Sequence, residues 1–149
     1  MLITTHIAVT VWLGKGLGLQ VPEMIVALAG GVLVDIDHLF KPGWRKTFLE
    51  FIKTGQRMNN QNHHSWIQEL LPGLVVGSLI GLLINLTYPD IRWWILPLFQ
   101  AIHIFLDYLM KNAHQPFVPF SKWGFRGFIP NNSKIELILS VLALGLLLI

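Results

Sequence analysis

Residues 70–89 of the chain read LLPGLVVGSLIGLLINLTYP and carry no charged side chain. A helix needs about 20 predominantly apolar residues to cross the hydrocarbon core of a bilayer, because each residue advances the helix by about 1.5 Å. Residues 70–89 satisfy that requirement in one uninterrupted run. The sequence therefore predicts that this segment forms a membrane-spanning helix.

The composition of the whole chain also favours lipid over water as its surroundings. Of the 149 residues, 53% are hydrophobic and 13% are charged, whereas a water-soluble domain usually carries about a quarter charged residues. A chain of this length is expected to form one unit, here a single membrane-embedded domain over residues 1–149. Cysteine is absent, which excludes disulfides and cysteine-based zinc sites, so any metal would be bound by His, Asp and Glu.

Further apolar segments surround this run, and each is too long for a β-strand. The predicted helices cover residues 2–13, 22–40, 66–88, 91–110 and 133–149. Pro22 followed by Glu23, and Ser133 followed by Glu136, are typical of helix starts. We therefore expect an all-α fold, a polytopic membrane helical bundle of about five helices. Acids and histidines interrupt the second and fourth segments, so the sequence leaves open whether these two span the bilayer or form shorter buried helices.

Basic residues predict the orientation of this bundle. Lys15 and Arg92 lie in the turns at one end, and all the others lie in or just after the two long polar connections at the opposite end. These others are Lys41, Arg45, Lys46, Lys53, Arg57, Lys111, Lys122, Arg126 and Lys134. Because cytoplasmic loops are enriched in Lys and Arg, both connections should face the cytoplasm, with the C-terminus across the membrane.

The same connections contain aromatic residues suited to a headgroup interface, namely Trp44, Trp123 and Phe125. The net charge of +3 could suggest a nucleic-acid ligand. The sequence contains no run of basic residues interleaved with polar ones, a pattern typical of nucleic-acid-binding surfaces. We therefore predict no nucleic-acid partner.

Several ionisable residues interrupt or flank the apolar segments. Placing an ionisable group in a membrane costs free energy, so such residues usually have a function. In the predicted topology they all fall at the cytoplasmic end of the bundle, although they come from five different helices. They are His6, Asp35, Asp37, His38, His63, His64, His103, Asp107 and Glu136. Imidazole and carboxylate at one depth suit zinc or another borderline divalent ion. His103 and Asp107, at i and i+4, share a helical face and can bind one ion.

Simpler roles explain other polar residues. Glu23 and Asp90 are interpreted as helix caps. Glu69, near the start of its predicted helix, is interpreted as favouring the helix dipole rather than as a metal ligand. His114, in Asn-Ala-His-Gln-Pro, is either a solvated loop residue or a further ligand near Asp107. For the acids and histidines at the common end, the alternative to a metal is an internal salt-bridge cluster, but few Lys or Arg lie in these helices to neutralise it.

A series of motifs follows in one order along the chain. They are Thr5-His6, Gly30-Gly31-Val32-Leu33-Val34-Asp35-Ile36-Asp37-His38, His63-His64-Ser65, His103-Ile104-Phe105-Leu106-Asp107, Pro116-Phe117-Val118-Pro119-Phe120 and Glu136. In these motifs the sequence resembles the membrane-bound, metal-dependent hydrolase family, also described as LexA-binding, inner-membrane-associated hydrolases. Val34 and His63 stand where that family has Pro and Thr, and its His-Arg-Gly is absent here.

The resemblance implies a prokaryotic inner (cytoplasmic) membrane protein, and the positive-inside bias predicts that its site faces the cytoplasm. The family is distantly similar to the zinc phospholipase C and P1 nuclease group, which hydrolyses phosphoesters. By this similarity we expect a divalent metal, zinc with manganese as the alternative, and a water that it activates to attack a phospholipid or lipid-linked phosphate. Asp35 is the implied catalytic base. The implied metal ligands are His6, Asp37, His38, His64, His103, Asp107 and Glu136.

Two other functions stay open at this point. Intramembrane His and Asp also line ion pathways, which would make the chain a metal-ion or proton transporter. Transport sites tend to lie near the bilayer midplane, however, whereas these residues gather at one end. The absent His-Arg-Gly keeps open a non-catalytic membrane protein with a structural metal site.

Overall fold

The computed structural model describes residues 3–32, 69–111, 113–130 and 134–145, without the side chains of residues 134, 136 and 137. These residues are mostly helical, as the sequence predicts. The helices are α1 (Ile3–Gly16), α2 (Val21–Val32), α5 (Leu70–Thr87), α6 (Ile95–Tyr108) and α7 (Lys134–Gly145). Five helices are therefore confirmed for the described part of the chain.

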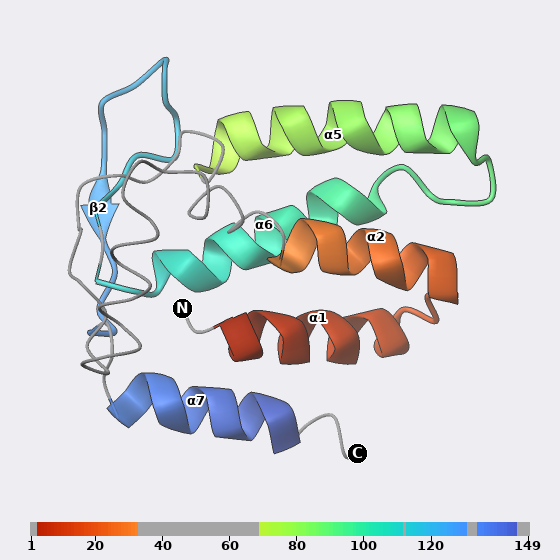
Figure 1. The fold of residues 1–149 in the computed structure, drawn as a ribbon. Helices are drawn as coiled ribbons and strands as arrows, with labels where there is room; N and C mark the ends of the chain where they lie inside the picture. The colour runs from red at the N-terminus through yellow and green to blue at the C-terminus, as the bar shows by residue number, and fades with distance from the viewer. Residues whose placement is uncertain (1–2, 33–68, 112, 131–133, 146–149) are drawn as a thin grey trace, which may run out of the picture.

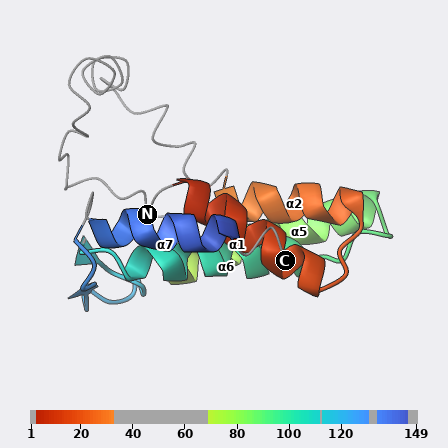
Figure 2. The same ribbon diagram turned by 90° about the horizontal axis from the view of Figure 1, so that it is seen from below.

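The helices lie side by side with nearly parallel axes (Figure 1), and the view from below shows the same long direction for all of them (Figure 2). Helix α6 packs against both α2 and α5, while α1 packs against α2 and α7. The starts of α1, α5 and α7 lie at the same end of the bundle as the ends of α2 and α6 (Figure 1). This up-and-down course brings the ionisable residues of α1 and α6 to one end.

Helix α5 begins at Leu70 rather than residue 66, because Glu69 has extended backbone geometry and forms its N-cap. Two other helix boundaries also differ from the prediction. Helix α1 continues to Gly16 and ends where Gly18 adopts a positive φ of 64°, so that Leu19 N–H bonds to the Gly14 carbonyl at 3.0 Å. This arrangement is a Schellman cap, so the cap rather than the end of the apolar run at residue 13 sets where the helix stops. Helix α6 begins at Ile95 rather than residue 91, because the amide of Asn85 donates to the Pro89 and Ile91 carbonyls and holds that segment as a turn.

Glycines of α5 let this helix lie close to α6 and to the turn before it. On α5, Gly73, Gly77 and Gly81 are buried at a spacing of four residues. A Cβ at Gly77 would meet the Gln100 side chain, and one at Gly81 would meet the Trp93 carbonyl. Small residues at this spacing allow helix backbones to approach closely, which is a common way of packing helices in membranes.

Large apolar side chains cover much of the outer surface of the helices. The most exposed of them on α5 are Val75, Leu79, Leu83 and Leu86, and α7 exposes Ile138, Val141 and Leu142. The buried core at Ala27, Ile95 and Phe99 is small in comparison. Among the described residues, α5 alone is long and apolar enough to cross a membrane, and α2 and α6 are shorter apolar helices.

A compact segment without helices, residues 113–130, follows α6 and covers the end of the bundle. Its short strands β1 (Ala113–His114) and β2 (Phe125–Arg126) pair in antiparallel fashion. The Leu109 carbonyl accepts from the Phe128 and Ile129 N–H groups at 3.1 and 2.9 Å, so the segment folds back onto α6. We call residues 113–130 the aromatic lobe, because Phe117, Phe120, Trp123 and Phe128 are exposed on it.

Candidate metal centre

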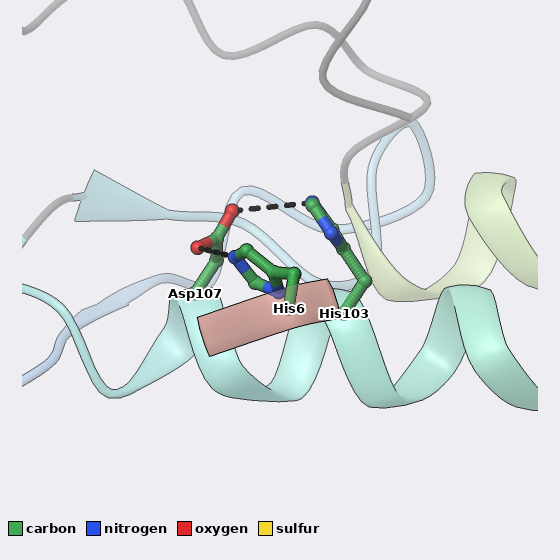
Figure 3. Close-up of side chains that lie close together, drawn as sticks. All are labelled: His6, His103 and Asp107. Carbon is green, nitrogen blue, oxygen red and sulfur yellow. Dashed lines mark hydrogen bonds and ion pairs between the residues drawn. The ribbon is translucent and has the colours of Figure 1, made fainter. Parts of the chain in front are cut away.

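Two histidines and one aspartate meet where the start of α1 crosses the end of α6. His6 lies in the first turn of α1, while His103 and Asp107 lie one turn apart on α6. One potential ligand atom from each side chain lies within 4.8 Å of the others. Figure 3 shows the carboxylate of Asp107 directed at both imidazole rings. The structure thus brings together three of the residues that the sequence predicts as metal ligands.

The distances within this cluster are short, and its histidines are buried. Nε2 of His6 lies 3.2 Å from Oδ1 of Asp107, and Nε2 of His103 lies 3.4 Å from Oδ2. Both imidazole side chains are 0% exposed, whereas Asp107 is 15% exposed. The two rings are stacked, with centroids 4.0 Å apart and an interplanar angle of 26°. Each imidazole therefore presents a nitrogen to a different oxygen of one carboxylate.

A backbone carbonyl of α2 sets the orientation of His103. Nδ1 of His103 lies 3.0 Å from the carbonyl oxygen of Gly31, where it is placed to donate a hydrogen bond. Because a carbonyl oxygen only accepts, this contact puts a proton on Nδ1, and Nε2 is the nitrogen that faces Asp107. A Cβ at Gly31 would collide with the hydroxyl of Thr10, so the close approach of α2 to the site needs glycine.

The donor set fits a divalent transition metal. Two imidazole nitrogens and one carboxylate oxygen are the ligands of many zinc sites that keep a further position open. A hydrogen bond from a ligand's second ring nitrogen to a carbonyl, as at His103 and Gly31, is the usual support for a metal-bound histidine. Nδ1 of His6 is buried and has no hydrogen-bond partner within the described ranges. The three side chains therefore form a donor set of the kind that holds a divalent cation.

Other predicted site residues lie in the part of the chain that the structure leaves out. The catalytic base Asp35 and the ligands Asp37, His38 and His64 fall within residues 33–68, as does His63. Glu136 lies in the first turn of α7, but its side chain is not described. Within the described ranges, His6, His103 and Asp107 form the one group with metal-binding spacing.

A second polar cluster lies beside the first and was missed by sequence reasoning. The Tyr108 hydroxyl donates to Oε2 of Glu69 at 3.0 Å and accepts from the Leu70 N–H at 2.9 Å. Glu69 is at the N-cap of α5, where its charge favours the helix dipole as expected. His114 is not a solvated loop residue: it is 2% exposed, and its ring packs 4.6 Å from that of Tyr108. Tyr108 directly follows Asp107, which is the signal that sequence reasoning could have used.

At the opposite end of the bundle, an ion pair connects α2 to the turn between α5 and α6. Arg92 donates from Nε and a terminal nitrogen to the two oxygens of Glu23, at 2.7 and 2.8 Å. Glu23 also accepts from the Gln20 N–H at 3.2 Å, so the predicted capping role is confirmed, and the link to the α5–α6 turn is additional. The hydrogen bonds to Glu23 raise the pKa of Arg92. The predicted capping role of Asp90 is wrong, because α6 begins only at Ile95, with Trp94 at its N-cap.

Comparison with known proteins identifies a family for the chain. The family model described as YdjM inner membrane protein matches residues 1–149. No curated protein and no solved structure matches the chain.

Proposed function

The chain belongs to the YdjM inner membrane protein family, and on that premise we propose that it is a membrane-bound, metal-dependent hydrolase of a phosphoester. The observation that carries the proposal is the convergence of His6, His103 and Asp107 on a single point at one end of the bundle. Burying a carboxylate costs free energy unless a positive charge balances it. A divalent cation bound by the two imidazoles and the carboxylate would supply that charge. Zinc is the proposed ion, and manganese is the alternative.

Each residue of the cluster has a defined task in this proposal. His6 and His103 would hold the ion through Nε2, and Asp107 would hold it through a carboxylate oxygen and offset part of its charge. A divalent ion supplies Lewis acidity, which makes water nucleophilic near neutral pH and stabilises charge on a phosphoryl oxygen. Because Asp107 keeps 15% of its side chain accessible and the imidazoles keep none, substrate would approach from the carboxylate side.

The proton of the attacking water needs an acceptor, and we assign that role to Asp35. Gly31, whose carbonyl contacts His103, precedes Asp35 by four residues. Four residues of chain reach at most about 14 Å, so Asp35 is within range of the cluster by chain length. Asp37, His38, His64 and Glu136 would complete the ligand set. A phospholipid or lipid-linked phosphate is the proposed substrate class, because the cluster lies at the end of a bundle with an apolar outer surface.

A structural metal site is the second candidate. His6 belongs to α1 and the other two residues belong to α6, so an ion at this point would tie the two helices together. A purely structural ion would do so without turnover. The two functions are therefore separated by activity in a protein that still binds metal.

The experiment compares four forms of the detergent-purified protein, each supplied with zinc or manganese and screened against phosphomonoesters and phosphodiesters. Removal of a general base typically lowers turnover by roughly 10²–10⁴-fold, so Asp35→Asn should be that much slower than wild type while it keeps its metal. His103→Ala should lose both metal and activity. Gln100→Ala is the matched control, because Gln100 is buried one turn before His103 on the same helix and lies outside the cluster.

Two results would count against the hydrolase. If the metal-loaded wild type hydrolysed no phosphoester in the screen, the structural candidate would replace it. If Asp35→Asn lost metal as completely as His103→Ala, Asp35 would be a ligand, and Asp37 or Glu136 would be the next residue to test as the base.

A further inference from the structure

The aromatic lobe is held against the helix bundle by backbone hydrogen bonds. Its first part is fixed to the start of α5, since the Leu71 N–H donates to the Pro116 carbonyl at 3.0 Å. Its last part is fixed to the chain just after α6, since the Lys111 N–H donates to the Ile129 carbonyl at 2.8 Å. Inside it, Phe125 packs edge-on against Tyr108 with ring centroids 5.1 Å apart. Phe125, which the sequence suggests for a headgroup interface, therefore faces inward.

Other aromatic residues of the lobe face outward. Phe120 is 84% exposed, Phe128 is 75% exposed and Trp123 is 58% exposed. Apolar groups of this size are normally buried in a protein surrounded by water, and a group of them marks a surface that contacts something else. The lobe joins the bundle at the start of α5, the helix long and apolar enough to cross a membrane. A span begins where the headgroups lie, so a segment fixed to the start of α5 would lie near the headgroups if α5 spans the bilayer.

The charges on this surface have a single sign. Lys111, Lys122 and Arg126 are exposed, and the sequence from residue 108 to residue 135 contains neither Asp nor Glu. Aromatic side chains beside exposed Lys and Arg match the two components of an anionic bilayer surface, the upper acyl chains and the phosphate groups. A protein partner would have to supply both apolar and acidic groups at the same spacing.

We propose that the aromatic lobe is a lipid-binding foot, which inserts Phe120, Trp123 and Phe128 among the headgroups of the adjoining leaflet and binds anionic phospholipid through Lys122 and Arg126. The foot would fix the depth and tilt of the bundle end that holds His6, His103 and Asp107. It needs neither a metal nor hydrolysis, so it stands or fails independently of the proposed activity.

The absence of cysteine makes the test direct, because one introduced cysteine carries one spin label. Labels are placed singly in Phe120→Cys and Phe128→Cys, in nanodiscs of phosphatidylcholine alone or mixed with phosphatidylglycerol. Accessibility to oxygen, which concentrates in lipid, is compared with accessibility to a water-soluble nickel chelate. We expect both labels to become more accessible to oxygen and less accessible to nickel when phosphatidylglycerol is present.

Charge variants complete the test. Adding Lys122→Gln and Arg126→Gln to each labelled chain should abolish the difference between the two lipids. Lys15→Gln, which removes an exposed charge at the opposite end of α1, should leave the difference unchanged. Labels that favour nickel in both lipids would overturn the proposal, because the lobe would then face water. Dipolar broadening between labels on two chains would also overturn it, since the surface would then bind a second copy.

Discussion

At the scale of single residues, the candidate centre depends on groups that do not themselves bind metal. The Gly31 carbonyl orients His103, and Thr10 leaves no room for a side chain at Gly31. Tyr108 has a comparable task beside the centre, since its hydroxyl joins the Glu69 carboxylate to the Leu70 N–H. These contacts connect the end of α6 to α2 and to the start of α5.

Removing the Tyr108 hydroxyl should destabilise the protein measurably. In Tyr108→Phe, the buried Glu69 carboxylate and the Leu70 N–H both lose a hydrogen bond. We expect the free energy of unfolding in detergent to fall by about 1–3 kcal/mol, the usual effect of leaving a buried polar group unsatisfied. Tyr88→Phe is the matched control, because Tyr88 is 62% exposed, and such surface changes usually stay within about 0.5 kcal/mol. Equal effects of the two variants would contradict this role for Tyr108.

The sequence predicted part of the residue-scale picture. The i, i+4 spacing was sufficient to pair His103 with Asp107, and the predicted depth of His6 agreed with its place beside them. The burial of His114 and the bridge made by Tyr108 could not be predicted. Both depend on how residues 113–130 fold back onto α6. No local sequence pattern predicts that contact between the segment and the helix.

At the scale of helices, α6 packs through close backbone contacts on both sides. A Cβ at Gly30 of α2 would lie 2.6 Å from the Leu96 carbonyl oxygen and 3.2 Å from the Gln100 backbone nitrogen. Backbone atoms cannot rotate away as the end of a side chain can. The two helices would have to separate to accept any larger residue.

A glycine pair tests this packing. Gly30→Ala should lower the free energy of unfolding by about 1–3 kcal/mol, the range for overpacking in a well-packed core. Gly16→Ala should be neutral or slightly stabilising, because a Cβ there meets nothing within 4 Å and alanine favours a helix over glycine by up to about 1 kcal/mol. Denaturation of both variants in one detergent should show a loss of stability for Gly30→Ala and none for Gly16→Ala. A neutral Gly30→Ala would show that α2 and α6 are less tightly packed than described.

The existence of the helices was easier to predict than their limits. Apolar run length was enough to place α1, α2, α5, α6 and α7. The helix limits, by contrast, follow from Gly18 at the end of α1 and from the Asn85 hydrogen bonds before α6. The link between Glu23 and Arg92 was not predicted either, because these residues are 69 positions apart and each has a simple local interpretation.

At the scale of the whole molecule, the arrangement predicts opposite exposure of its two ends. Lys122 in the aromatic lobe lies at the end that holds the candidate centre, and Asp90 lies in the turn before α6 at the other end. Positive-inside bias predicts that the lobe faces the cytoplasm. Single-cysteine variants Lys122→Cys and Asp90→Cys, probed with a membrane-impermeant maleimide, should therefore react from the cytoplasmic and the opposite side, respectively. Reaction of both from one side would contradict a membrane crossing by α6, which connects the two positions, and by α5, whose start is hydrogen-bonded to the lobe.

The family and the fold together leave the chemistry of the centre as the central question. Membership of the YdjM inner membrane protein family indicates an inner membrane protein. The positions of α1 and α6 bring His6, His103 and Asp107 together. The proposed activity, the ligand roles outside the cluster and the base all depend on whether His6, His103 and Asp107 bind a cation.

Metal content per chain tests that claim most directly. Wild type, His103→Ala, Asp107→Ala and Gln100→Ala are purified in detergent after growth with zinc and manganese, and each is measured by elemental analysis. The account predicts at least one equivalent of transition metal in wild type and Gln100→Ala, and a large loss in both cluster variants. Wild type without metal, or His103→Ala with as much metal as Gln100→Ala, would contradict it.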